Sequence, residues 1–155
     1  MTTPVQQPIT GHETVAAAGT PFAALVQFYR AFNGRDMAEM EKNWEQSPDI
    51  AMDNPLGGIK RGWDEIRGVY DRIFSGPAKV YVEYYDYTIH AYGEVFYAVG
   101  RERGRFEKNG TVIELGIRTS RIFRMTLNGW KQVHHHGSIE NPELLEKYQR
   151  AVSEK

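Results

Sequence analysis

The segment "AKVYVEYYDYTIHAYGEVFYAVGRERGRF", residues 78–106, decides the fold class of this chain. It is rich in the β-branched and aromatic residues that favour strands, and Gly93 divides it as a turn residue does. Downstream, "KNGT" (108–111) and "LNGW" (127–130) each contain an Asn-Gly pair, the strongest short signal for a β-hairpin. These turns bracket a third strand, and a fourth follows the second turn. The sequence therefore predicts a meander of four long antiparallel strands.

Helical patterns flank this meander on both sides. Apolar residues recur at helical spacing between suitable start and stop residues in three segments before it, at 20–34, 36–44 and 62–76, and in one after it, at 141–152. The fold class that follows is α+β. We expect a cone-shaped, curved antiparallel sheet packed by three N-terminal helices, with a short C-terminal helix.

The N-terminal stretch differs in composition from the rest. Residues 1–19 are polar and interrupted by Pro and Gly, so we expect an N-terminal arm without a core of its own. Residues 20–155 are then expected to form a single domain, because 155 residues suit one compact core.

The composition excludes several classes of partner. With 19 basic and 20 acidic residues, a net charge of -1 and a pI near 6.5, the chain lacks the basic footprint of a nucleic-acid-binding protein. There is no cysteine to form disulfides or to ligate metals through sulfur. The apolar runs are too short to span a bilayer, and the first residues do not resemble a signal peptide. We therefore expect a soluble, cytoplasmic protein that binds neither nucleic acid nor membrane.

One strand carries a basic residue on its apolar face. In "TVIELGIRTSRIFRM" (111–125) the odd positions are nearly all apolar and should face the core, but Thr119 and Arg121 share that face. A buried guanidinium is costly unless a carboxylate or an anion meets it. Either Arg121 has such a partner or a bulge turns it outward. We expect it inside or at the mouth of a pocket, with Asp53 or a substrate carboxylate as its partner.

The last strand holds three consecutive histidines in "GWKQVHHHGS" (129–138). Successive strand residues point to opposite faces, so the three cannot converge on one metal ion. His134 and His136 project together, but no third ligand is suitably spaced, and we predict no metal site and no cofactor. Neutral histidines that hydrogen-bond within a sheet or a pocket are the commoner case.

The order of elements, the segments "DNPLGG" (53–58) and "GWDEI" (62–66), and the terminal "GWKQVHHHGS" together resemble the nuclear transport factor two-like superfamily. Within it, residues 20–153 are similar to the SnoaL-like branch related to ketosteroid isomerase. The resemblance implies a cone-shaped α+β barrel with a small-molecule cavity between sheet and helices. It also implies a homodimer that pairs through the outer face of the sheet.

The resemblance carries over to single residues only in part. Tyr29 matches the oxyanion tyrosine of the isomerase, and Thr119 matches its second oxyanion donor. The isomerase's general-base aspartate precedes a proline, where this chain has Asn54, which cannot accept a proton from carbon. Asp53 is adjacent, but it replaces that base only if the strand is bulged, because adjacent residues face opposite sides.

The same resemblance sends the even positions of the last strand into the cavity. We therefore expect His134, His136 and Ser138 to line it and His135 to face outward or toward a partner subunit. A cavity histidine could then serve as the base that Asn54 cannot be. Trp63, from the third helix, is also expected to contact a ligand.

Two functions remain open from the sequence. The first is a cavity protein that binds a small hydrophobic carbonyl or carboxylate compound without chemistry. The second is an isomerase, cyclase or dehydratase with His134 or His136 as general base, Tyr29 as oxyanion donor and Arg121 as the orienting charge. Fold alone does not decide between them.

Overall fold

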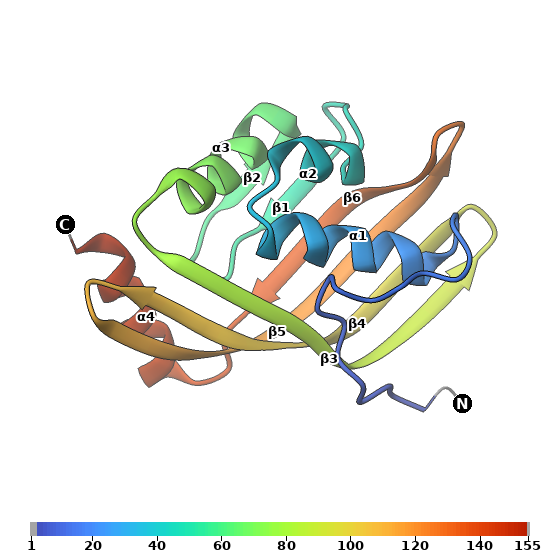
Figure 1. Ribbon diagram of the computed structural model, residues 1–155. Helices are drawn as coiled ribbons and strands as arrows, with labels where there is room; N and C mark the ends of the chain where they lie inside the picture. The colour runs from blue at the N-terminus through green and yellow to red at the C-terminus, as the bar shows by residue number, and fades with distance from the viewer. Residues whose placement is uncertain (1–2, 155) are drawn as a thin grey trace.

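The computed structural model describes residues 3–154 as an α+β fold built on one curved, open sheet (Figure 1). The sheet has six strands in the order β2-β1-β6-β5-β4-β3. Four of them form the predicted antiparallel meander: β3 (Lys79–Tyr92), β4 (Val95–Lys108), β5 (Thr111–Thr126) and β6 (Gly129–Ser138). The prediction of this meander is confirmed.

Two short strands extend the sheet beyond the meander. The segment "DIAMDNPLGGIKR" (49–61), which lies between the second and third helices, contains a hairpin of β1 (Ala51–Asp53) and β2 (Ile59–Arg61). β1 pairs with β6 in parallel, so the sheet is mixed rather than purely antiparallel. This hairpin places a loop, residues 54–58, beside the end of β6.

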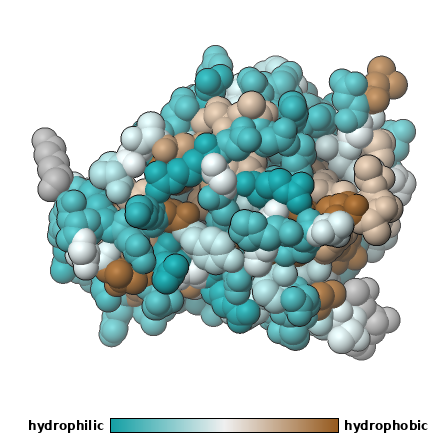
Figure 2. All heavy atoms as spheres, in the orientation of Figure 1, coloured by the Kyte–Doolittle hydropathy of each residue, from teal (hydrophilic) through white to brown (hydrophobic). Residues whose placement is uncertain are grey.

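The helices occupy the expected positions. Helix α1 (Pro21–Asn33), α2 (Met37–Asn43) and α3 (Gly62–Ser75) lie over one face of the sheet, and α4 (Pro142–Ser153) packs at one end against β5 (Figure 1). The side chains of Thr20, Asp36 and Asn141 accept backbone N–H groups at the starts of α1, α2 and α4, which accounts for these boundaries. Hydrophilic residues predominate over the helices in Figure 2, since their apolar faces are buried. No helix among residues 3–154 is long and apolar enough to cross a membrane.

The long strands curve because they contain irregularities. The pairing of β3 with β4 shifts between Tyr85 and Thr88, where Asp86 adopts a positive φ of 50°. The pairing of β5 with β6 shifts between Ile122 and Phe123, opposite one extra residue, Val133. A bulge bends its strand and increases the local twist. The concave face that results is the one the helices cover.

The N-terminal segment lies along the outer edge of β3. The backbone N–H of Val5 donates to the backbone carbonyl oxygen of Tyr87 at 2.8 Å, and Ile9 exchanges two backbone hydrogen bonds with Tyr84. The side chain of Ile9 is 1% exposed and belongs to the main core. The expected arm therefore covers a sheet edge and contributes a residue to the core of the domain.

Candidate functional site

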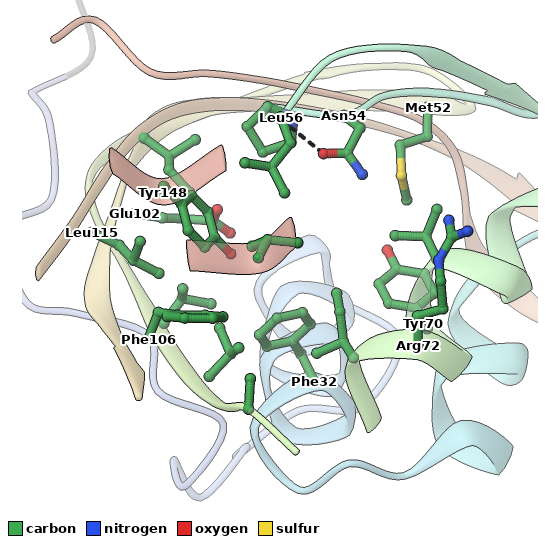
Figure 3. A pocket seen from close by; sticks show the side chains of 18 of the residues that line it. Phe32, Met52, Asn54, Leu56, Tyr70, Arg72, Glu102, Phe106, Leu115 and Tyr148 are labelled. Atoms are coloured by element: carbon green, nitrogen blue, oxygen red, sulfur yellow. Dashed lines mark hydrogen bonds between the residues drawn. The ribbon is translucent and has the colours of Figure 1, made fainter. Parts of the chain in front are cut away.

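The helices and the concave face of the sheet enclose a cavity of about 560 Å³. Its walls come from α1, α3, α4, the β1–β2 hairpin and the central strands. Most of the lining is apolar, as the labelled side chains in Figure 3 show. The principal apolar lining residues are Phe28, Phe32, Val69, Tyr70, Val82, Phe106, Leu115, Ile117 and Tyr148.

The cavity has an opening on one side, where side chains cover it only in part. Four of its lining residues, Gly57, Arg72, Pro77 and Val152, are exposed to solvent. They belong to the β1–β2 loop, the C-terminal part of α3 and its following turn, and α4. The opening therefore lies between these three elements, and the sheet forms the inner wall.

A buried ion pair forms the polar part of the inner wall. Arg121 of β5 is 2% exposed, and its Nη2 lies 3.0 Å from Oε2 of Glu102 on β4. Arg121 also donates from Nη1 to Gln132 at 2.8 Å, and its guanidinium lies 3.6 Å from the centre of the Phe28 ring. The burial of Arg121 beside a carboxylate confirms the placement predicted from strand alternation. The partner is Glu102 and not Asp53.

Two hydroxyl groups complete the environment of the Glu102 carboxylate. The Tyr29 hydroxyl donates to Glu102 Oε2 at 2.6 Å, and the Thr119 hydroxyl donates to Oε1 at 3.0 Å. Burial raises the pKa of the Tyr29 phenol well above its usual range, so the phenol stays neutral and keeps the proton that it donates. Neither residue lines the cavity. A single hydroxyl proton given to Glu102 is not available to a ligand, so this geometry does not support the expected oxyanion roles of Tyr29 and Thr119.

The bulge in β6 changes which histidine faces the cavity. Gln132 is buried, but after Val133 the alternation shifts by one residue, and His135 and Gly137 are the next buried positions. His135 lies opposite Arg121 in the β5–β6 pairing and lines the cavity. The prediction that His135 faces outward is therefore wrong, because it assumed an unbroken period of two.

The predicted cavity positions of His134, His136 and Ser138 are wrong for the same reason. The His134 ring is hydrogen-bonded through Nδ1 to the Ala51 carbonyl oxygen, and Ser138 Oγ accepts a hydrogen bond from Arg118. His136 has a side chain that is 52% exposed, and its Nδ1 lies 2.7 Å from Asp53 Oδ2. All three lie on the opposite face of the sheet from the cavity.

His135 is an unusual buried group. Among residues 3–154 its Nδ1 has no hydrogen-bond partner. Burial, followed by the nearby charge of Arg121, holds the pKa of His135 well below its usual value of 6.5. The imidazole is therefore neutral at pH 7, with one nitrogen free to donate or accept a hydrogen bond according to its tautomer.

The β1–β2 loop contributes one polar group. Asn54 lines the cavity, and its Oδ1 accepts a hydrogen bond from the Leu56 N–H at 2.9 Å, which leaves the amide NH2 turned toward the interior in Figure 3. Asp53 does not line the cavity, and its Oδ2 lies 2.7 Å from Nδ1 of His136. Trp63 does not line the cavity either, and its Nε1 donates to Glu41 at 3.1 Å.

Glu102 is the main site residue that the sequence interpretation missed. The even positions of β4 are apolar or small on either side of it, while the neighbouring odd positions are Arg101, Arg103 and Arg105. The same alternation that placed Arg121 inward would have placed Glu102 inward beside it. Among residues 3–154 no cluster of three or more His, Asp or Glu side chains is arranged to hold a metal ion.

Solved structures support the fold assignment. A ketosteroid isomerase-like protein from Erwinia carotovora atroseptica is 19% identical and aligns with a TM-score of 0.63 over 78% of this chain and 94% of its own. An NTF2-like superfamily protein from Salmonella enterica (21% identity, TM-score 0.65) aligns over 74% of this chain and 84% of its own. The CaMKII hub from S. rosetta (16% identity, TM-score 0.67) aligns over 81% of this chain and 98% of its own. At these identities the similarity establishes the fold alone.

Sequence comparison identifies the family more directly. No curated protein matches the chain, but the SnoaL-like domain family matches residues 22–142, from the start of α1 to the start of α4. The matched region includes β4 and β5, which carry Glu102 and Arg121, and His135 of β6. The chain therefore belongs to the SnoaL-like domain family.

Proposed function

We propose that this protein binds a small hydrophobic carbonyl or carboxylate compound in the cavity. The observation that carries the proposal is a cavity of about 560 Å³ with a mostly apolar lining and a few polar groups gathered on one wall. Small-molecule sites usually occupy about 300–1,000 Å³ and have this composition. A volume of this size corresponds to roughly 19 water molecules at about 30 Å³ each. Expulsion of that water from apolar walls favours binding.

The inner wall suits an uncharged hydrogen-bonding group. Glu102 and Arg121 neutralise each other, and His135 is neutral because its pKa is lowered. An unsatisfied buried polar atom costs about 1–3 kcal/mol. A ligand carbonyl or hydroxyl group that hydrogen-bonded with the His135 ring, which lines the cavity, would offset this cost. The ligand would thereby gain orientation as well as affinity.

The binding proposal is tested by a thermal-shift screen with hydrophobic carbonyl and carboxylate compounds. A ligand at 100 times its dissociation constant adds about 2.7 kcal/mol to the free energy of unfolding. Leu115→Trp, which fills the cavity, should abolish the shift, whereas Val112→Trp, at a 51% exposed position on the same strand, should retain it. Equal shifts in the two variants would place binding elsewhere and contradict the proposal.

A second candidate function is proton transfer with His135 as general base. It is favoured by one observation, the neutral imidazole of His135 in the cavity wall. Arg121, which lines the cavity, would be the group that stabilises developing negative charge. His135→Gln keeps a hydrogen-bonding side chain but removes the base, so turnover should fall on the order of 100-fold while binding is retained. Undiminished turnover in this variant excludes His135 as the base.

We also propose that two copies pair through the outer face of the sheet. Val99 (44% exposed) and Tyr92 (69%) leave apolar area on this face, and the rings of His90 and Tyr97 stack there at 4.5 Å. Burial of this area in a two-fold interface would remove it from water. Sedimentation at about 50 μM should show a dimer, since standard interfaces persist at such concentrations. Val99→Asp should shift it to a monomer, whereas Leu127→Asp, at a fully exposed turn, should not.

A further inference from the structure

The cavity lining is strongly basic although the chain as a whole is not. Four lining residues are basic and one is acidic, a net charge of +3 with histidine neutral, whereas the whole chain carries -1. The acidic residue, Glu102, pairs with Arg121 on the inner wall. The uncompensated positive charge therefore belongs to Lys60, Arg72 and Lys108.

Lys60 and Arg72 flank the opening from two different elements. Lys60 lies opposite Met52 in the β1–β2 pairing, is only partly exposed and lines the cavity. Arg72 lies in the last turn of α3, is exposed and lines the cavity as well. Figure 3 shows Arg72 on the opposite side of the cavity from Glu102. Neither cation takes part in any of the ion pairs formed within residues 3–154.

The third cation, Lys108, forms hydrogen bonds within the fold. The Lys108 Nζ donates to the carbonyl oxygens of Ala151 and Val152 at 3.4 and 3.5 Å, and to that of Glu154. These carbonyls are at the C-terminal end of α4, where a cation is favourable and the last carbonyls have no partner within the helix. Lys60 and Arg72 are the two lining cations without such hydrogen bonds among the described residues.

We infer that the ligand is an amphipathic acid whose carboxylate lies at the opening between Lys60 and Arg72 and whose apolar body fills the cavity. This inference rests on the proposed binding function and fixes the ligand's orientation. At the inner wall a carboxylate would lie next to the carboxylate of Glu102 and would lose its water, both of which are unfavourable. At the opening it keeps part of its hydration and meets two cations. An uncharged carbonyl or hydroxyl group is left to contact His135.

One electrostatic effect opposes this placement. The C-terminal end of α3, with its partial negative charge, lies beside the opening. Arg35 donates to the carbonyl oxygens of Phe74 and Ala78 there, at 3.5 and 2.6 Å, and so offsets this charge. Two unit charges outweigh a partial charge that already has a cationic partner. The field at the opening therefore attracts anions.

The inference is tested with two probes of nearly equal size, 10-hydroxydecanoate and its methyl ester. Their dissociation constants are measured by titration calorimetry at low ionic strength. The acid should bind the wild-type protein about 10-fold more tightly than the ester, and Lys60→Met and Arg72→Met should each reduce that preference about threefold or more. Arg61→Met and Arg67→Met are the matched controls, because both residues lie on the same elements but do not line the cavity.

The outcomes separate the two proposals. If the acid and the ester bind equally well, and the Lys60 and Arg72 variants change neither affinity, the placement of the charge is refuted while the binding function stands. If neither probe binds the wild-type protein, the proposed function fails together with this inference. A salt titration gives a second readout that needs no variant: raising the salt should weaken binding of the acid and leave the ester unaffected. Equal salt dependence of both probes overturns the inference.

Discussion

Replacement of Glu102 by Gln should be among the most destabilising single changes in this protein. The substitution keeps the size of the side chain but removes the charge that balances Arg121. The guanidinium, which is 2% exposed, would retain only uncharged close partners, namely the side-chain oxygen of Gln132, the Tyr29 hydroxyl at 3.4 Å and the ring of Phe28. The new amide would also point an N–H group at one of the hydroxyl groups, of Tyr29 or Thr119, that now donate hydrogen bonds to Glu102.

The magnitude follows from this loss of partners. Glu102 accepts three side-chain hydrogen bonds, from Tyr29, Thr119 and Arg121, and is itself 5% exposed. Removal of one member of a buried ion pair costs about 3–5 kcal/mol because the other charge stays buried without compensation. Domains of this size have a total free energy of unfolding of about 5–15 kcal/mol. Glu102→Gln should therefore remove a large share of the stability.

The assay is urea unfolding of a four-member set comprising the wild type, Glu102→Gln, Arg121→Met and the double variant. The double variant buries no unpaired charge, so it should be more stable than either single variant, with a coupling energy of about 2 kcal/mol or more. Glu146→Gln breaks an ion pair with Arg150 whose side chains are 71% and 68% exposed, and it should cost less than about 0.5 kcal/mol. A loss below about 1 kcal/mol for Glu102→Gln, or additive single effects, would refute the reasoning.

Three further predictions concern stability. The lowered pKa of His135 means that the unfolded state binds a proton that the folded state does not. The contribution of neutral His135 to the free energy of unfolding is therefore fully present above about pH 6.5, and the free energy falls by up to about 1.4 kcal/mol per pH unit below it. His135→Gln should remove this slope in urea titrations at pH 5–8. Ile9→Ala should lower the free energy of unfolding in urea by about 2–4 kcal/mol. A loss below about 0.5 kcal/mol, as expected for a surface substitution, would mean that the N-terminal segment is not part of the core. Gly104→Ala should lower the melting temperature sharply in calorimetry, because the added Cβ would lie 1.8 Å from the Tyr81 carbonyl oxygen, whereas Gly116→Ala, whose Cβ would meet nothing closer than 3.9 Å, should not.

Most of the fold is predictable from the sequence because it rests on local signals. The Thr20 hydroxyl and the Asn141 side chain cap their helices as expected, and each effect spans only a few residues. Asn109 and Gly110 take the positive φ angles, 51° and 81°, that a tight hairpin turn requires. The parallel pairing of β1 with β6 is different, because it joins residues about 83 positions apart and leaves no local mark in either strand.

The candidate site was predictable only where a strand is regular. β5 alternates without interruption from Ile113 to Phe123, so Arg121 is assigned correctly to the concave face. β4 alternates equally well, so the same count applied to this strand would have placed Glu102 on the concave face. β6 is not regular: it pairs with β1 and β5, and its register against β5 shifts by one residue at Val133. Alternation counted from Trp130 is correct as far as Gln132 and fails from His134 onward.

That one-residue shift at Val133 determines the chemistry of the cavity. Without it, two histidines would face the interior and His135 would lie outside. With it, a single imidazole lies beside Arg121, and Gly137 takes the next inward position, where an added Cβ would lie 3.1 Å from the ring of Pro55. The glycine thus lets the β1–β2 loop approach the sheet closely, and this loop carries Asn54 into the cavity. The polar inner wall therefore depends on backbone pairing between distant segments, so a member of this family that lacks the bulge should present a different set of side chains to its ligand even with the same histidine run.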